Sequence, residues 1–238
     1  MNLYALFKDE YKRKARLFPA TLSSIPAAIL LCLLAYYALE TSSLIRFLGS
    51  LLASLTFAVC ALEWFGVMLV CWTGRAIERV LFDNGNRFPS TEILLCCDNY
   101  LAKQTKKSVR NKISKDLDIK LLSQKQEDKD IVEARKTIRD AIDRVRKIVG
   151  DGRTVLQYNI HYGAIRNLIG GCCFACPLSV CVAALGWAGM RNGFVTCLGI
   201  ALFVVYLLPL LFLSPLLKSF GYRYARILLA EYMEIKVG

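Results

Sequence analysis

Four long apolar blocks constrain this chain more than any other feature of its sequence. The hydrocarbon core of a bilayer is about 30 Å thick, so a helix needs roughly 20 consecutive apolar residues to cross it. The blocks that meet this requirement are 17–39, 47–72, 168–189 and 194–217. They are too long and too poor in charge for the buried helices of a soluble domain. The sequence therefore predicts an all-α integral membrane protein with four transmembrane helices.

The distribution of Lys and Arg predicts how the chain crosses the membrane. Of the 31 basic residues, five lie in 1–16, twenty in 73–167 and four after Leu217, whereas Arg46 and Arg191 stand alone in the two short turns. Short loops rich in Lys and Arg stay in the cytoplasm. We therefore expect both termini and the 73–167 segment on the cytoplasmic side. The net charge of +12 is then explained mainly by the membrane topology, and binding to nucleic acid is the second-ranked explanation.

Two hairpins flanking a soluble insert give the expected domain organisation. Leu3, Phe7 and Tyr11 recur at helical spacing among charges, which is typical of a short amphipathic helix at the membrane surface. The expected parts are an amphipathic segment 1–16, a first transmembrane hairpin 17–72, a cytoplasmic helical domain 73–167, a second hairpin 168–217 and a cytoplasmic tail 218–238.

The insert contains one strongly patterned helix, expected over 131–149 and ended by Gly150 and Gly152. Its apolar residues alternate by three and four, which fits a short coiled coil or packing against another cytoplasmic helix. Earlier in the insert, the 83–86 turn ends the second span, and we expect Ser90 to cap a helix starting at 91–92. The expected partner-binding residues are Lys106, Lys107, Arg110, Ile131, Ile138 and Val145.

Glu63 is the single acidic residue inside the four blocks. It lies about 14 Å from Trp72 along a helix, close to the bilayer midplane. Carboxyl groups at this depth are costly and face a bundle interior or a water-filled path. Thr56 and Cys60 share its helix face. Two interpretations stay open: Glu63 lines a pore or titrates, with Tyr206 or a neighbouring copy as partner, or it is a hydrogen-bonded packing residue.

The third and fourth blocks carry further patterns. Small residues at four-residue intervals predict a close packing face, within the chain or between copies. These residues are Gly171, Ala175, Ser179 and Ala183. Pro209 and Pro215 interrupt the fourth block, which indicates a kinked helix or, less often, a gate.

Polar and aromatic residues gather just before the third block. They are Tyr158, Asn159, His161, Tyr162, Gly163, Arg166 and Asn167. They are consistent with an interfacial anchor, in which Arg166 snorkels to the headgroups. They are also compatible with a junction that couples the cytoplasmic helices to the third span, with Gly163 as its flexible point, although the anchor ranks first.

No residue pattern for catalysis or for a cofactor is visible. The chain has no phosphate-binding glycine loop, metalloprotease motif or nucleophile elbow. Cys173 and Cys176 form a single C-x-x-C, but no second pair and no nearby His complete a metal site. We therefore expect a protein that is not an enzyme and that binds neither cofactor nor metal.

Three short motifs resemble those of a family of bacterial inner-membrane proteins with four transmembrane helices. They are Asp9-Glu10-Tyr11-Lys12-Arg13 leading to Phe18-Pro19-Ala20, then Phe88-Pro89-Ser90-Thr91, and then Tyr162-Gly163-x-x-Arg166-Asn167-Leu168. The family signature is Tyr-Gly-x-Arg-Arg-Asn, and Ala164-Ile165 here omit its first arginine. The resemblance implies a location in the bacterial inner membrane. Multi-pass proteins of similar layout act as effectors or sensors in antiphage systems.

The function expected from these features is that of an oligomeric channel-like effector or membrane sensor. Its partners would be membrane lipids, further copies of itself, and a cytoplasmic protein or small ligand. The alternative is a membrane scaffold that recruits a soluble partner, and a transporter or lipid-handling enzyme ranks below both.

Overall fold

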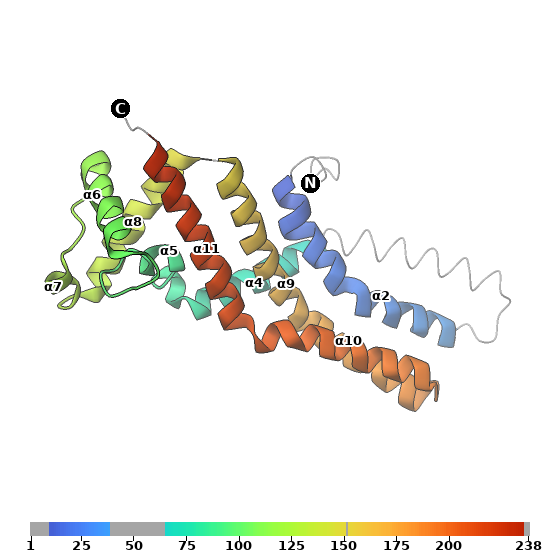
Figure 1. Cartoon of the computed structure of the whole chain (residues 1–238). Coiled ribbons are helices and arrows are strands. Elements are labelled where there is room, and N and C mark those ends of the chain that lie inside the picture. Colours follow the sequence, from blue (N-terminus) through green and yellow to red (C-terminus); the bar gives the residue numbers. More distant parts are fainter. Residues whose placement is uncertain (1–9, 39–64, 151, 236–238) are drawn as a thin grey trace. The chain divides into compact units, whose positions relative to one another are not determined.

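The computed structural model describes residues 10–38, 65–150 and 152–235, and Figure 1 shows its helices. In these ranges the chain forms helices joined by turns and contains no strand. The expectation of an all-helical chain is confirmed for this part. Glu63, Thr56 and Cys60 lie outside the described residues, as does most of the expected second span.

Three of the described helices are long and apolar enough to cross a membrane. They cover Lys12–Ala35, Arg153–Gly189 and Gly193–Leu211. The first, third and fourth apolar blocks of the sequence lie mainly in these helices. A chain with three such helices is compatible with a multi-pass membrane protein. The first of them joins the π-helical turn η1 (Lys12–Leu17) to α2 (Phe18–Ala38).

The helix formed by the fourth apolar block is shorter than expected. α10 covers Gly193–Leu211, and a new helix, α11, covers Leu213–Glu234. Proline cannot donate a backbone hydrogen bond and is tolerated in the first turn of a helix, which is where Pro215 lies in α11. Pro215 therefore belongs to the helix after the membrane span, whereas Pro209 lies inside α10.

The chain divides into two compact units. Unit 1 contains the chain up to Ile77 together with Gly163–Leu213, and unit 2 contains Glu78–Tyr162 together with the chain from Ser214. α4 (Val67–Leu81) and α9 (Arg153–Ala184) continue from one unit into the other. The segment from residue 218 onward, which we expected to be a separate tail, belongs to the same unit as the insert.

In unit 1 the second part of α9 is followed by the π-helical turn η4 (Leu185–Gly189), and α10 runs back beside it (Figure 1). Gly199 of α10 touches the backbone of Ala183, and Gly186 of η4 lies against the backbone of Thr196. A second group of buried residues joins the amino-terminal helix to α4: Leu17, Ala20, Val67, Val70 and Cys71.

Unit 2 has its core around α8, which covers Ile131–Val149 as expected. The Asp130 side chain accepts a hydrogen bond from the Glu133 N–H at 3.0 Å, and Gly150 ends the helix with a φ of 62°. The other helices are α5 (Pro89–Glu92), α6 (Lys103–Leu117) and α7 (Gln124–Glu127), with the turn η3 at Asp83–Gly85. α11 buries Ala225, Leu228, Leu229 and Tyr232 in the same core.

The prediction that Ser90 caps a helix is wrong. α5 has only four residues, and its N-cap is Phe88 rather than Ser90. The three apolar residues that follow, Ile93, Leu94 and Leu95, are fully buried from a turn segment instead of lying along a helix face. Their burial in the core outweighs the helical tendency of the local sequence.

The carboxyl-terminal helix gives the first prediction, because its apolar residues complete the core of unit 2. Leu228→Ala removes a fully buried side chain, so we expect the free energy of unfolding to fall by about 2–5 kcal/mol. Denaturant unfolding of the full chain in detergent, followed by circular dichroism, measures the change. Arg226→Ala on the exposed face of the same helix is the control. Equal stability of Leu228→Ala and the control would contradict a core role for α11.

Candidate functional site

A buried side-chain amide joins α9 to the amino-terminal helix in unit 1. Asn167 has no exposed surface, and its Nδ2 donates a hydrogen bond to the backbone oxygen of Ala15 at 2.6 Å. In a regular α-helix this oxygen would accept from the N–H of residue 19, but residue 19 is proline and has no N–H. Ala15 lies in the π-helical turn η1, where carbonyls bond five residues on, so Pro19 removes the α-helical partner of this oxygen and Asn167 supplies a side-chain donor.

Glycines allow three helices to approach closely around Asn167. A Cβ atom on Gly163 would lie 3.0 Å from the Tyr11 hydroxyl, and one on Gly74 would lie 2.7 Å from the Arg166 oxygen. On Gly170 it would lie 2.5 Å from the Val70 oxygen. Glycine is required where backbones come this close. The boundary between the two units falls at Gly163, so its expected role as a flexible point stays a prediction, and the structure adds a packing contact with Tyr11.

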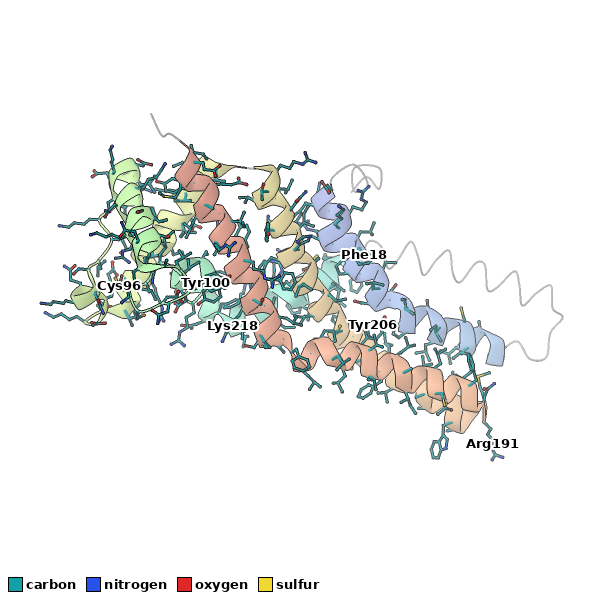
Figure 2. All side chains as sticks on the ribbon, in the orientation of Figure 1. Phe18, Cys96, Tyr100, Arg191, Tyr206 and Lys218 are labelled. Carbon is teal, nitrogen blue, oxygen red and sulfur yellow. The ribbon has the colours of Figure 1, made fainter. Side chains whose placement is uncertain are left out.

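A second proline contact joins α10 to α2. The Tyr206 hydroxyl donates to the backbone oxygen of Leu22 at 2.5 Å, and the residue four positions after Leu22 is Pro26. Figure 2 labels Tyr206 on α10, where its ring is buried against Cys172, Ala175 and Cys176 of α9. The expected role of Tyr206 was to line a pore or to pair with Glu63. The structure shows it bonded to a carbonyl that Pro26 leaves open.

The small-residue face of the third block packs inside the chain. A side chain on Gly171 would collide with Ser23 of α2, and one on Gly199 of α10 would collide with Ala183. Ala175 and Ser179 are fully buried between these points. The sequence left open whether this face contacts the same chain or another copy. The structure shows that it contacts α2 and α10 of the same chain.

The remaining junction residues lie in unit 2, at the start of α9. The Tyr162 hydroxyl donates a short hydrogen bond to the carboxylate of Glu78 on α4, and Glu78 is itself buried. His161 is exposed, and the edge of its ring packs near Tyr158 with 6.1 Å between ring centroids. The structure therefore separates the predicted set: Tyr162 bonds to α4, whereas Tyr158 and His161 contact each other.

Two of the basic residues expected to bind a partner are used inside unit 2. Lys106 is only 6% exposed, and its Nζ donates to the backbone oxygens of Leu95 and Asp98. Arg110 forms an ion pair with buried Glu127 at 2.8 Å and donates to the backbone oxygens of Leu94 and Leu122. These contacts hold the turn segment after α5. Lys107 is exposed, so its expected role stays a prediction.

The apolar residues expected to bind a partner also face inward. Ile138 and Val145 are at most 1% exposed, and Ile131 packs at the edge of the same core. Of the two arrangements predicted for α8, a coiled coil or packing against another cytoplasmic helix, the structure shows packing against other helices of the insert. A surface for a soluble partner must use other residues.

Buried tyrosines complete this core with polar contacts. The Tyr232 hydroxyl donates to Asp116 at 3.1 Å, and the Tyr222 hydroxyl donates to Asp98 at 3.2 Å. Burial raises the pKa of both phenols, and the adjacent carboxylates raise the pKa further. Both hydroxyls therefore stay protonated at physiological pH, and each fixes α11 to a different part of the insert.

A cavity of about 220 Å³ lies where α8 ends and α9 begins in unit 2. Its polar lining consists of Arg146, Asn159 and Tyr224, with Gly150, Val155, Leu156 and Leu228 as the other walls. The Arg146 guanidinium lies over the Tyr224 ring and donates to the Ser90 hydroxyl, while its buried Nε has no hydrogen-bond partner among the described residues. Asn159, one of the expected junction residues, thus lines a small polar cavity.

Among the described residues, no three His, Cys, Asp or Glu side chains lie close enough together to hold a metal ion. Cys176 is buried, whereas Cys173 points to the exposed side of α9. Comparison of the chain with family models, curated proteins and solved structures gives no match. The candidate site is therefore defined by geometry alone: the Asn167 contact and the glycines around it.

The sequence did not predict that Asn167 would bond to the carbonyl whose α-helical partner Pro19 removes, although both residues belong to the motifs that carry the resemblance. The useful signal was a proline inside an apolar helix together with a hydrogen-bond donor on another apolar helix. Only the fold shows which carbonyl and which donor meet.

A double-mutant cycle tests whether Asn167 compensates for Pro19. Asn167→Ala leaves the Ala15 oxygen without the amide, so we expect a loss of about 1–3 kcal/mol of unfolding free energy. In the Pro19→Ala background the new N–H bonds this oxygen, and the cost of Asn167→Ala should fall by about 0.5–3 kcal/mol. Unfolding of the full chain in mixed micelles by sodium dodecyl sulfate measures each step.

Asn159→Ala serves as the control for this cycle, because it removes an amide from the same helix without a contact to Ala15. Its cost should be the same with Pro19 and with Ala at position 19. Equal costs of Asn167→Ala in the two backgrounds would show that the proline does not create the need for the amide.

Proposed function

We propose that this chain is an oligomeric multi-pass protein of the bacterial inner membrane that acts without catalysis, as a channel-like effector or sensor controlled through its cytoplasmic helices. The observation that carries the proposal is the continuity of the helix from Arg153 to Gly189. A helix of this length extends for about 55 Å. Its first residues belong to unit 2, and its apolar part belongs to unit 1.

In the proposed mechanism this helix has a ligand-binding contact at its beginning and a fixed contact to the amino-terminal helix further along. At its beginning the Arg146 cavity offers a place where a ligand would contact α8, α9 and α11 together. Further along, Asn167 fixes it to the amino-terminal helix at a specific carbonyl. In the proposed mechanism, a change at the beginning of α9 is passed along this helix to the span. Glu63, on the expected second span, remains the proposed pore-lining acid.

The resemblance to bacterial inner-membrane proteins agrees with this arrangement. Tyr11 and Pro19, from its first motif, and Gly163 and Asn167, from its last, meet in unit 1. The motifs would then mark one structural junction. We extend the proposal to antiphage defence by analogy with effectors and sensors of similar layout.

Ion flux and dye leakage from liposomes that contain the full chain test the effector. We expect leakage above that of protein-free liposomes, and Glu63→Gln should reduce it several-fold because the carboxyl lines the path. Glu10→Gln is the control, since Glu10 pairs with Lys14 on an exposed surface. Light scattering of the detergent complex gives the number of copies. A monomer, or leakage that Glu63→Gln leaves unchanged, would refute the pore.

The second candidate is a scaffold that recruits a soluble acidic protein. It is favoured by three exposed lysines on one side of α6, Lys103, Lys107 and Lys115. Replacing all three with Gln should abolish capture of that protein by the full chain without changing leakage. The full chain is needed for this test because the core of the insert includes α11.

A further inference from the structure

The three backbones that meet around Asn167 each carry an arginine next to the contact. Ala15 is followed by Arg16, Gly74 is followed by Arg75, and Asn167 is preceded by Arg166. The contacts Asn167–Ala15 and Gly74–Arg166 therefore bring three guanidinium groups from three helices to one region of unit 1. In agreement, all three act electrostatically on the Cys71 thiol of α4.

Local contacts hold two of these side chains, Arg16 and Arg75, in place without neutralising them. Arg75 Nε donates to the backbone oxygen of Cys71 at 3.2 Å, and the Arg16 guanidinium lies 5.6 Å from the centre of the Tyr11 ring. Neither of these two arginines forms an ion pair with a carboxylate in the described part of the chain. The nearby Glu10 pairs with Lys14 at 2.8 Å. A concentration of positive charge therefore remains at this point.

Large aromatic side chains mark this region as a membrane interface. Phe18, two residues after Arg16, is 61% exposed, and Trp72, three residues before Arg75, is 67% exposed. In each of these two helices an apolar, lipid-facing surface thus begins beside an arginine. Aromatic and basic residues in this order are typical of the headgroup level of a bilayer.

We propose that Arg16, Arg75 and Arg166 bind the phosphate of an anionic phospholipid headgroup on the cytoplasmic side. Guanidinium groups bind phosphate oxygens through paired, charge-assisted hydrogen bonds. Basic sites between transmembrane helices bind such headgroups. The exposed aromatic rings would contact the acyl chains of the same lipid. The site does not depend on whether the protein conducts ions, so it goes beyond the proposed function.

Native mass spectrometry of the detergent-solubilised full chain tests this site with phosphatidylglycerol and phosphatidylcholine of matched acyl chains. We expect the wild type to prefer phosphatidylglycerol. Each arginine near the surface contributes about fivefold in affinity, so Arg16→Gln with Arg75→Gln should weaken phosphatidylglycerol binding by about 25-fold. Phosphatidylcholine binding should change little.

Arg191→Gln is the matched control, because Arg191 lies at the turn between η4 and α10, beyond the end of the helix that carries Arg166, and Figure 2 labels it there. It should keep the preference of the wild type. If the double Gln variant does not fold, Arg75→Gln alone and the charge-conserving Arg16→Lys with Arg75→Lys replace it, with about fivefold and smaller losses expected. An unchanged preference in folded Gln variants would overturn the site. Displacement by millimolar inorganic phosphate would overturn the lipid in favour of a soluble phosphate.

Discussion

A backbone carbonyl that is buried away from water needs a hydrogen-bond donor, and this constraint shapes unit 1. The amino-terminal apolar helix contains Pro19 and Pro26, and each removes the N–H that would bond the carbonyl four residues earlier. Those two carbonyls, of Ala15 and Leu22, accept hydrogen bonds from Asn167 on α9 and Tyr206 on α10. The prolines therefore do more than bend a helix: they create two acceptors at fixed positions, and each selects one neighbouring helix.

A donor and an acceptor that must meet within hydrogen-bond distance require close helices, and the small residues follow from this. Gly163, Gly170 and Gly171 lie on the faces of α9 that contact the amino-terminal helix and α4, and Gly199 lets α10 approach Ala183. Because this face is occupied within the chain, contacts between copies must use other surfaces. The exposed positions on the outer side of α9, such as Cys173 and Val180, remain accessible in the described structure.

The sequence was informative where local patterns determine structure and uninformative where a distant partner does. α8 has the predicted bounds because its apolar period and Gly150 are local signals. Residues 218–238 were taken for a tail because Leu228, Leu229 and Tyr232 reach their core only through the fold. Likewise Lys106 and Arg110 look like a solvent-exposed basic surface, and nothing local shows that carbonyls and Glu127 surround them. The two proline contacts belong to this second kind.

The position of the polar residues along α9 supports a mechanical role more strongly than their chemical types do. A simple interfacial anchor needs aromatic and basic side chains at one depth, and it does not need a fully buried amide. Asn167 instead fixes the rotation of α9 about its own axis, because only one face of the helix carries the donor and the flanking glycines. Upstream on the same helix, Asn159 and Tyr162 contact a cavity and a carboxylate of unit 2. The polar residues of α9 therefore act in two units, with Asn159 and Tyr162 in unit 2 and Asn167 in unit 1, and the boundary between the units falls at Gly163.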